Sequence, residues 1–248
     1  MKKVVIVTGG GRGIGAATSM LLAAKGFDVC VNYRTRAKEA DAVVSAIQNS
    51  ASQKGGGNAI AVAADVSKED EVNALFDATE QAFGTITHLV NNAGVLAPQS
   101  RLEDLNVERF NHILTSNVTS CFLCCKAAIK RMTRGGAIVN VSSVASRTGS
   151  PNEYIDYAAS KGAMDTLTKG LSLEVADQGI RVNSVRPGFI LTDMHADGGE
   201  PDRVNRLSPN IPLKRGGTPE EVANAIAWLL SDEAAYVTGS FIDIAGGK

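Results

Sequence analysis

Apolar, β-branched segments alternate with segments of helical periodicity along the whole chain of 248 residues. Strands are predicted at 3–8, 28–33, 59–63, 86–91, 137–141, 181–185 and 241–244, and the main helices at 14–25, 36–52, 68–83, 107–134, 155–178 and 219–230. Because this alternation is typical of a parallel sheet covered by helices, we predict a doubly wound, seven-stranded α/β fold. The first strand, VVIV at 4–7, is continuously apolar, as a strand buried on both faces should be. No shift in composition marks a boundary, so residues 1–248 are predicted to form a single domain.

Charge and hydropathy exclude several classes of function. With 25 basic and 26 acidic residues the formal net charge is −1, which gives no field to attract nucleic acid or acidic membranes. No stretch approaches the roughly 20 apolar residues of a membrane span. The first apolar run, 4–7, is also too short for the core of a signal peptide. We therefore expect a cytoplasmic protein that binds neither nucleic acid nor membranes.

The four cysteines do not form a metal-binding pattern. Cys30 lies alone in a predicted strand, whereas Cys121, Cys124 and Cys125 crowd one helical stretch. Neither a second CxxC pair nor a neighbouring pair of histidines accompanies them, so we expect no metal. We predict buried, inert thiols, and a redox role for Cys121 and Cys124 is the alternative.

A glycine-rich loop, TGGGRGIG at 8–15, follows the first predicted strand and opens the first predicted helix. Glycines allow a tight turn and let backbone amides approach a pyrophosphate, which the free N–H groups of a helix N-terminus then bind. This position predicts a dinucleotide site, and the alternative is a glycine-rich turn without a ligand. The residues expected to form the site are Gly9, Gly11, Arg12, Gly13, Ile14 and Gly15.

The end of the second predicted strand indicates which dinucleotide binds. An NAD site places an acidic residue about 20 residues past the glycines, where it binds the ribose 2′-hydroxyl. The sequence instead reads Asn32-Tyr33-Arg34, and the planar guanidinium of Arg34, with Arg12 and Arg36, suits a 2′-phosphate. We therefore predict a preference for NADP(H). The alternative is that Arg34 and Arg36 are ordinary surface residues and the site also accepts NAD(H).

The stretch YIDYAASK at 154–161 contains a pair of residues suited to proton transfer. Tyr157 and Lys161 are one helical turn apart, whereas Tyr154 has Ala158 at that offset. At about 4 Å and an effective dielectric constant of about 20, an ammonium stabilises a phenolate by roughly 4 kcal/mol. Such a lysine would lower the pKa of Tyr157 toward neutrality, which suits a general acid and base. Tyr154 is expected to line a substrate pocket instead, or to be an amphipathic residue at a helix start.

The least regular part of the chain is 188–217, where five of thirty residues are glycine and three are proline. A segment of this length without regular structure is usually functional or disordered, and we predict a mobile lid over a bound ligand. His195 and Asp197 lie in it, and with Glu153 they are polar side chains suited to a polyol or sugar. A lone histidine of this kind is more often solvated than in contact with substrate.

The order of the motifs resembles that of the short-chain dehydrogenase/reductases. TGGGRGIG is followed by NNAG at 91–94, Asn117, SS at 142–143, YAASK at 157–161 and RPGFILT at 186–192. The resemblance covers essentially the whole chain, and the wider pattern is similar to bacterial glucose 1-dehydrogenase-like members and to 3-oxoacyl-carrier-protein reductases. It implies a Rossmann-type fold, an NADP(H)-linked oxidoreductase and a homotetramer.

The resemblance also implies roles for individual residues. Tyr157 would be the acid and base, Ser143 would bind the substrate oxygen, Lys161 would bind the nicotinamide ribose and lower the pKa of Tyr157, and Asn117 would hold a water of a proton relay. The glycines Gly9, Gly13 and Gly15 would hold the pyrophosphate. Further cofactor contacts are expected from Tyr33, Arg34, Asp65, Val66, Asn91, Ala93, Gly94, Pro187, Gly188, Ile190 and Thr192.

Two departures limit what the resemblance implies about substrates. Tyr157 follows Ser143 by fourteen residues, where many members have thirteen, and the extra residue lies beside the expected pocket. Gln178 stands where carrier-protein reductases often have a basic residue, which argues mildly against a carrier-protein substrate. A sugar or polyol, a small ketone and an acyl thioester remain candidate substrates. A dinucleotide-sensing protein without turnover is the alternative from another class.

Overall fold

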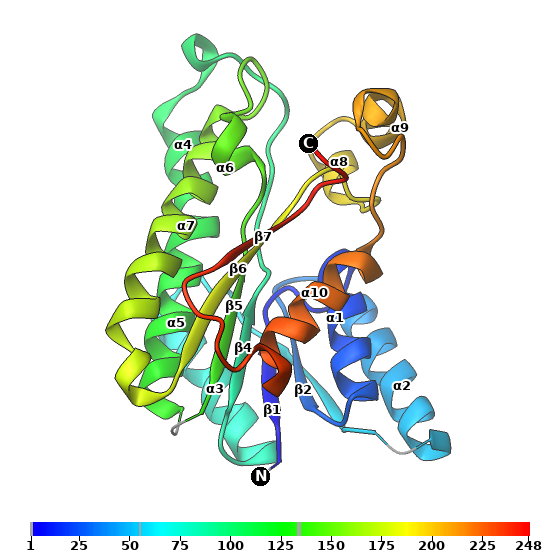
Figure 1. The fold of residues 1–248 in the computed structure, drawn as a ribbon, viewed down its shortest axis with the longest axis vertical. Coiled ribbons are helices and arrows are strands. Elements are labelled where there is room, and N and C mark those ends of the chain that lie inside the picture. The colour runs from blue at the N-terminus through cyan, green and yellow to red at the C-terminus, as the bar shows by residue number, and fades with distance from the viewer. Residues whose placement is uncertain (1, 55, 133–134) are drawn as a thin grey trace.

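The computed structural model describes residues 2–54, 56–132 and 135–248. Its seven strands form one sheet in the order β3-β2-β1-β4-β5-β6-β7, and all neighbouring strands are parallel (Figure 1). The strands are β1 (Val4–Val7), β2 (Asp28–Tyr33), β3 (Ala59–Ala63), β4 (His88–Asn91), β5 (Ala137–Val141), β6 (Arg181–Pro187) and β7 (Phe241–Ile244). The predicted seven-stranded parallel sheet is therefore confirmed.

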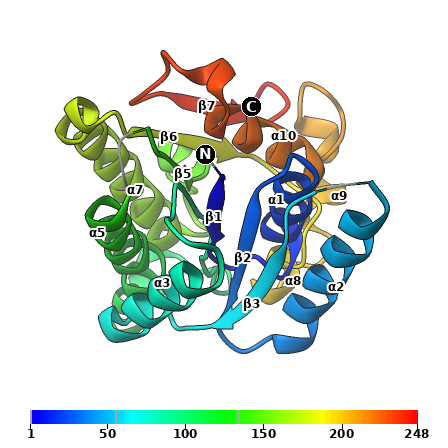
Figure 2. The same ribbon diagram turned by 90° about the horizontal axis from the view of Figure 1, so that it is seen from below.

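Helices cover both faces of this sheet (Figure 2). One face is covered by α3 (Glu69–Phe83), α5 (Ser120–Arg131) and α7 (Ile155–Glu174), and the other by α1 (Gly13–Ala24), α2 (Ala37–Lys54) and α10 (Pro219–Leu230). The side chains of β1 alternate between two apolar cores. Val4 and Ile6 pack in the core beside α3, and Val5 and Val7 pack in the core beside α1. This double burial explains why β1 is apolar at every position.

Helix α10 begins and ends at its predicted residues. Its start is determined by neighbouring residues of the sequence. The Thr218 hydroxyl accepts a hydrogen bond from the Glu221 N–H, and the Glu221 carboxylate accepts one from the Thr218 N–H. This reciprocal cap satisfies two N–H groups that the first turn leaves free. Pro219, which lacks an N–H, takes the first helical position.

The long helix predicted at 107–134 is interrupted. It consists of α4 (Val107–Leu114), a π-helical turn (Thr115–Thr119) and α5 (Ser120–Arg131), and residues 133–134 lie outside the described residues. Such turns are rare and occur frequently at functional sites. Asn117, a predicted site residue, lies in this turn and is fully buried. The helix predicted at 155–178 is shorter than expected, since α7 ends at Glu174 and a 3₁₀ turn (Ala176–Gln178) follows.

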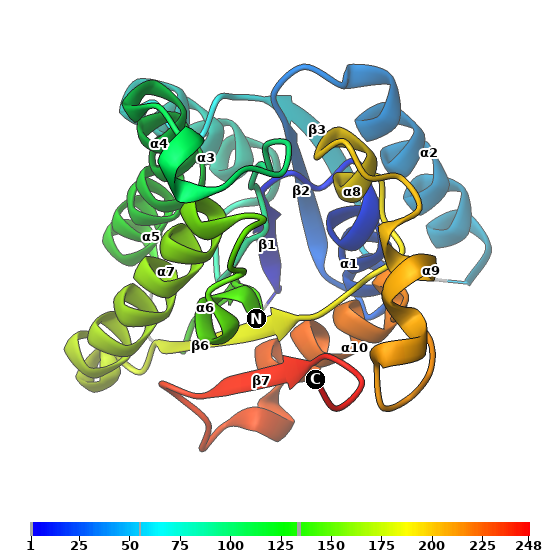
Figure 3. The same cartoon turned by 90° about the horizontal axis from the view of Figure 1, so that it is seen from above.

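The strand order places the site. β1 lies between β2 and β4, so the chain connections run outward in opposite directions from this point. Open parallel sheets bind ligands beyond the carboxyl ends of the strands where this reversal occurs. The segment 188–217 lies at this end of the sheet and contains α8 (Met194–Asp197), α9 (Arg203–Leu207) and a 3₁₀ turn (Ser208–Asn210). Seen from above, α8 lies near α1 (Figure 3).

Several short elements were not predicted. They include α6 (Ala145–Thr148) and the 3₁₀ turns Leu102–Asp104 and Asp232–Ala234. They also include α8 and α9, so the expectation that 188–217 lacks regular structure was wrong. All of these elements are too short to show a hydrophobic period. Among the described residues, no helix has the length and apolar character needed to cross a membrane.

The four cysteine thiols are buried, as predicted. Burial raises the pKa of Cys30 to about 12 and also raises the pKa of Cys124, so both thiols stay protonated and poorly nucleophilic. Within the described ranges, no group of three histidine, cysteine or acidic side chains could hold a metal ion.

Candidate active site

The glycine-rich loop between β1 and α1 has a shape that only glycine tolerates. Gly9 and Gly13 have φ values of +61° and +51°, which disfavour residues with a side chain. A Cβ at Gly15 would lie 2.2 Å from the carbonyl oxygen of Gly9. The loop is therefore held tightly against the start of α1, where free backbone N–H groups attract an anion.

A cavity of about 410 Å³ opens in front of this loop. Its walls come from the loop, from the end of β2, from the turn after β3, from the turn after β4, and from the start of the 188–217 segment. Twelve of the predicted cofactor residues line it: Gly9, Gly11, Arg12, Gly13, Ile14, Tyr33, Arg34, Asp65, Val66, Ala93, Gly94 and Thr192.

The side chains of the cavity suit a dinucleotide. The Nη1 atom of Arg12 is buried and has no hydrogen-bond partner among the described residues, so its N–H groups are free to donate to an anionic ligand. Asp65 accepts hydrogen bonds from the N–H and hydroxyl of Ser67. Although partial desolvation opposes them, these bonds and the nearby Arg34 charge lower the pKa of Asp65 below its ordinary value. Asp65 therefore remains an ionised acceptor at neutral pH.

Other predicted cofactor residues lie outside the cavity wall. Asn91 is buried in the sheet, where its Nδ2 donates to Asn140 Oδ1 at 2.9 Å and to Cys125 Sγ at 3.2 Å. Its neighbour Asn92 lines the cavity instead, and its Nδ2 donates to the carbonyls of Thr8 and Gly9 at 3.0 and 3.1 Å. Sequence reasoning singled out the first asparagine of NNAG. The strand alternation, which turns successive side chains to opposite faces, could have drawn attention to the second.

A second group of predicted residues gathers after β5 and on α7. Ser143, which follows the end of β5, lies close enough to the Tyr157 hydroxyl for its side chain to influence the pKa of that phenol. The Ser143 hydroxyl also donates to the Pro187 carbonyl at 3.4 Å. Lys161 lies one turn after Tyr157 on α7, and its Nζ is 5.5 Å from the centre of the Tyr157 ring.

Asn117 is fixed in position beside Lys161. Its Oδ1 accepts from the Val95 N–H at 2.8 Å, and its Nδ2 donates to the Val95 carbonyl at 3.1 Å and to Ser160 Oγ at 3.0 Å. A Cβ added to Gly94 would lie 3.3 Å from Asn117 Oδ1 and 3.6 Å from Lys161 Nζ. Gly94 also lines the dinucleotide cavity, so this glycine joins the cavity to the Asn117 and Lys161 side chains.

The pKa values differ from the sequence-based expectation. Desolvation raises the pKa of Tyr157 to about 12, although the hydrogen bond with Ser143 opposes the shift. Desolvation also lowers the pKa of Lys161 to about 8. Because the Lys161 ammonium donates to the Val141 carbonyl at 2.8 Å instead of approaching the phenol, it does not offset the burial of Tyr157 in the protein alone.

The predicted substrate residues gather around an arginine that sequence reasoning missed. Arg203 of α9 is only 5% exposed, and its guanidinium pairs with Glu153 and lies 2.6 Å from Glu200. It also lies 4.8 Å from the ring centre of Tyr154 and 5.4 Å from that of Phe189. The sequence gives no signal for this pairing, since Arg203 and Glu153 are fifty positions apart.

His195 lies beside this group, with its ring centre 6.5 Å from that of Phe189. Desolvation and the Arg203 charge lower the pKa of His195, so its ring is neutral at physiological pH. Ile190 is buried and pairs with Gly217 in an isolated parallel bridge, which closes the base of the 188–217 segment. Pro187 and Gly188 mark the start of this segment, at the end of β6.

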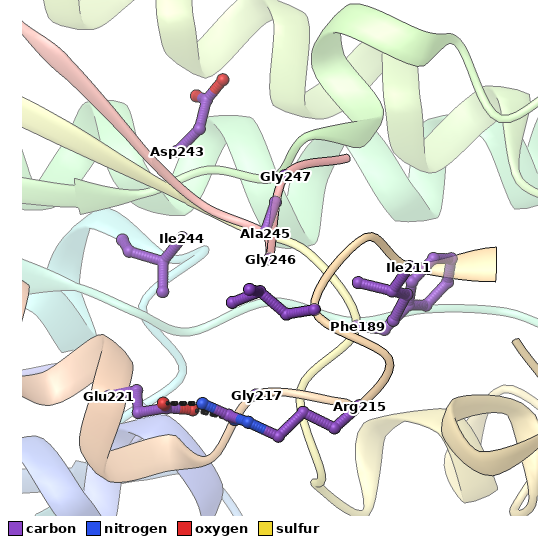
Figure 4. Close-up of a pocket in the computed structure, with 11 residues that line it drawn as sticks. Phe189, Ile211, Arg215, Gly217, Glu221, Asp243, Ile244, Ala245, Gly246 and Gly247 are labelled. Carbon is purple, nitrogen blue, oxygen red and sulfur yellow. Dashed lines mark hydrogen bonds and ion pairs between the residues drawn. The ribbon is translucent and has the colours of Figure 1, made fainter. Parts of the chain in front are cut away.

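A separate cavity of about 330 Å³ lies beside β7 (Figure 4). Arg215 and Glu221 point toward one another at one side of it, joined by an ion pair of 2.6 Å. Phe189, Ile211 and Ile244 are among its apolar walls. It contains none of the predicted residues of the dinucleotide cavity or of the Ser143 and Tyr157 group.

Comparisons with known proteins agree with this geometry. Residues 9–248 match a family model described as Enoyl-(Acyl carrier protein) reductase. The chain is 59% identical to an uncharacterized oxidoreductase of Escherichia coli (strain K12), with 99% of each chain covered. It is 42% identical to a 3-oxoacyl-[acyl-carrier-protein] reductase of Synechocystis, covering 99% of this chain and 96% of that one. It is 38% identical to glucose 1-dehydrogenase 2 of Bacillus subtilis, with coverage of 99% and 94%.

A solved structure extends the likeness to three dimensions. The short chain dehydrogenase of Burkholderia cenocepacia, crystallised in complex with NADP, is 34% identical and superposes with a TM-score of 0.89, covering 99% of this chain and 97% of that one. The family model and the full-length relatives agree with the fold and with the glycine-rich loop. The chain therefore belongs to the short-chain dehydrogenase/reductase family and is an oxidoreductase acting on CH–OH or carbonyl groups.

Proposed function

We propose that the protein interconverts an alcohol and a carbonyl with NADP(H), and that Tyr157 is the general acid and base. The observation that supports this most is the junction at Gly94, where the dinucleotide cavity meets the Asn117 and Lys161 side chains. One turn before Lys161, the Tyr157 hydroxyl lies near the Ser143 side chain. A nicotinamide bound in this cavity would supply or accept the hydride.

The residues of the chain then handle the oxygen and the proton. Ser143 and Tyr157 donate hydrogen bonds to the substrate oxygen, where negative charge develops as the carbonyl is reduced. Tyr157 gives its proton to that oxygen in reduction and takes it back in oxidation. Lys161 supplies positive charge near the ribose and the phenol. The Asn117 amide is fixed by two hydrogen bonds, one from the Val95 N–H and one to the Val95 carbonyl. In this position it would hold the water of the proton relay next to Lys161.

The preference for NADP(H) rests on the arginines of the cavity. Arg12, Arg34 and Arg36 all line it, and the end of β2 carries Asn32 and Tyr33 in place of an acidic residue. Guanidinium groups bind a phosphate through two parallel hydrogen bonds, so three of them favour a cofactor with an additional 2′-phosphate. The glycines of the loop and the start of α1 would hold the pyrophosphate, and Asp65 would accept from the adenine.

The substrate is a sugar, a polyol or a small ketone in this proposal. The segment 188–217 acts as the lid. Within it, Arg203 contacts Glu153 and Tyr154, and Phe189 lies beside His195. A relative named as a glucose 1-dehydrogenase supports this class. A 3-oxoacyl-carrier-protein substrate is the second candidate, because a relative at 42% identity carries that name.

We also propose a cytoplasmic homotetramer. Helix α7 carries four small residues. Ala158 is buried within the subunit, whereas Ala159, Gly162 and Ala163 are exposed or partly exposed and allow close approach of a second helix. Phe122 on α5 and Leu173 on α7 are large apolar side chains with 47% and 68% exposure. Light scattering on a sizing column tests this assembly.

The first test follows nicotinamide absorbance with purified protein. NADPH is offered with ketones and an acetoacetyl thioester, and NADP with sugars and alcohols. We expect Tyr157→Phe to reduce kcat/KM by at least about a hundredfold, the range of general acid and base catalysis. Tyr236→Phe is the matched control, since it removes the same hydroxyl from a fully exposed tyrosine and should leave turnover unchanged. Equal turnover in wild type and Tyr157→Phe would show that Tyr157 is not the acid.

A further inference from the structure

Asp197, at the end of α8, lies among the arginines of the dinucleotide cavity. Its Oδ2 is 2.5 Å from Arg12 Nη2, and its Oδ1 is 3.7 Å from Arg36 Nη2. Asp197, Arg12 and Arg36 all line the cavity. A carboxylate of the 188–217 segment therefore occupies the position between two of the three arginines to which we assign the 2′-phosphate.

This carboxylate uses only part of the binding capacity of the arginines. One nitrogen of Arg12 pairs with Asp197, while Nη1 is buried without a hydrogen-bond partner in the described part of the chain. A phosphate monoester carries close to two negative charges at neutral pH and has three acceptor oxygens. It can satisfy more donors of Arg12 and Arg36 than one carboxylate can.

The ion pair is open enough to be exchanged. The side chains of Arg12 and Asp197 are 35% and 38% exposed, and that of Arg36 is 52% exposed. Exposed pairs of this kind are weakly held and screened by salt. An incoming phosphate can therefore displace the Asp197 carboxylate without unfolding the loop or α8.

We propose that Asp197 is a specificity-determining residue that weakens the preference for NADP(H) over NAD(H). The 2′-phosphate of NADP(H) has to displace Asp197 from Arg12 and Arg36, whereas NAD(H) binds with these ion pairs intact. The carboxylate that favours NAD in other dinucleotide sites stands at the end of the second strand. Here α8 supplies a carboxylate to the same cavity. This proposal rests on the proposed function, because it assumes that a nicotinamide dinucleotide binds in the cavity.

The test measures dissociation constants for NADPH and NADH by titration calorimetry. We expect Asp197→Asn to tighten NADPH binding about threefold to tenfold and to change NADH binding less than about twofold. Asp193→Asn is the matched control. Asp193 lies in the same segment and lines the same cavity, but it forms no ion pair with any described residue. Its replacement should change the ratio of the two constants by about twofold at most.

A double variant tests whether Asp197 and the 2′-phosphate compete for the same arginines. In an Arg12→Gln background, Asp197→Asn should tighten NADPH binding less than it does in the wild type, because the pair with Arg12 is already absent and only the longer pair with Arg36, at 3.7 Å, is left to break. Equal tightening of NADH and NADPH by Asp197→Asn would mean that Asp197 only latches the segment, and would overturn the proposal. Unchanged or weaker NADPH binding would overturn it too. If neither dinucleotide binds to wild type or variant, the proposed function itself is wrong and this proposal with it.

Discussion

At the scale of single residues, Lys161 bears a positive charge at a position that is only 3% exposed. Desolvation lowers its pKa from 10.5 to about 8, so above pH 8 the folded protein releases a proton that the unfolded chain keeps. The free energy of unfolding should therefore rise with pH between about 8 and 10, by up to roughly 3 kcal/mol from this group. Tyr157 has the opposite effect only above pH 10, because its raised pKa favours proton retention in the folded state.

Lys161→Met is the matched variant, since it keeps an unbranched side chain beside Met164 and removes the titrating group. Urea denaturation across pH 7–10 should show a rise in stability for the wild type that exceeds that of the variant. Parallel pH profiles for the two proteins would contradict the burial of a charged Lys161. Sequence spacing predicted that Lys161 and Tyr157 lie together. It did not predict that the ammonium turns to the Val141 carbonyl, because that contact depends on how β5 packs against α7.

At the scale of elements, the loop between β1 and α1 makes the sharpest prediction. A Cβ at Gly15 would lie 2.2 Å from the Gly9 carbonyl oxygen, so Gly15→Ala must displace backbone. We expect a loss of stability of about 1–3 kcal/mol and a clear weakening of dinucleotide binding. Gly170→Ala on α7 is the control. A Cβ there meets no atom within 4 Å, and alanine in an exposed helical position should stabilise the protein by up to about 1 kcal/mol. Unchanged dinucleotide binding in Gly15→Ala would contradict the role of the loop.

Elements whose signals are local could be predicted from the sequence. The start of α10 follows from its cap, and the seven strands follow from their apolar runs. The π-helical turn at Thr115–Thr119 could not be predicted. It inserts one residue into an otherwise continuous helix, and the spacing of apolar residues in the sequence does not reveal so small an insertion. What fixes this turn is the pairing of Asn117 with the backbone of Val95, twenty-two positions away.

At the scale of the whole molecule, ion pairs join the 188–217 segment to the rest of the fold, and the pair between Arg203 and Glu153 has the more deeply buried arginine, compared with the pair between Arg12 and Asp197. The alternation of strands and helices predicted a sheet covered on both faces, and the glycine-rich loop predicted the end of the sheet at which the 410 Å³ cavity lies. Neither pattern predicted which contacts fix the 188–217 segment in place, since Arg203 and Glu153 are fifty positions apart in the chain. This ion pair joins α9 to the loop before α7, and it is the part of the site that depends most on the assembled fold.

Removing the Arg203 guanidinium should release the segment. Arg203→Met leaves the Glu153 side chain, which is 32% exposed, without its arginine partner and removes the contacts with the Tyr154 and Phe189 rings, so we expect the contacts of the segment to weaken by about 1–3 kcal/mol. We expect limited proteolysis within 188–217 to accelerate at least about tenfold, the ratio that 1.4 kcal/mol of local opening produces. Arg206→Met is the control on the same helix, because Arg206 is 51% exposed and pairs with Glu200 at the surface. Equal cleavage rates in the two variants would show that contacts other than Arg203 hold the segment closed.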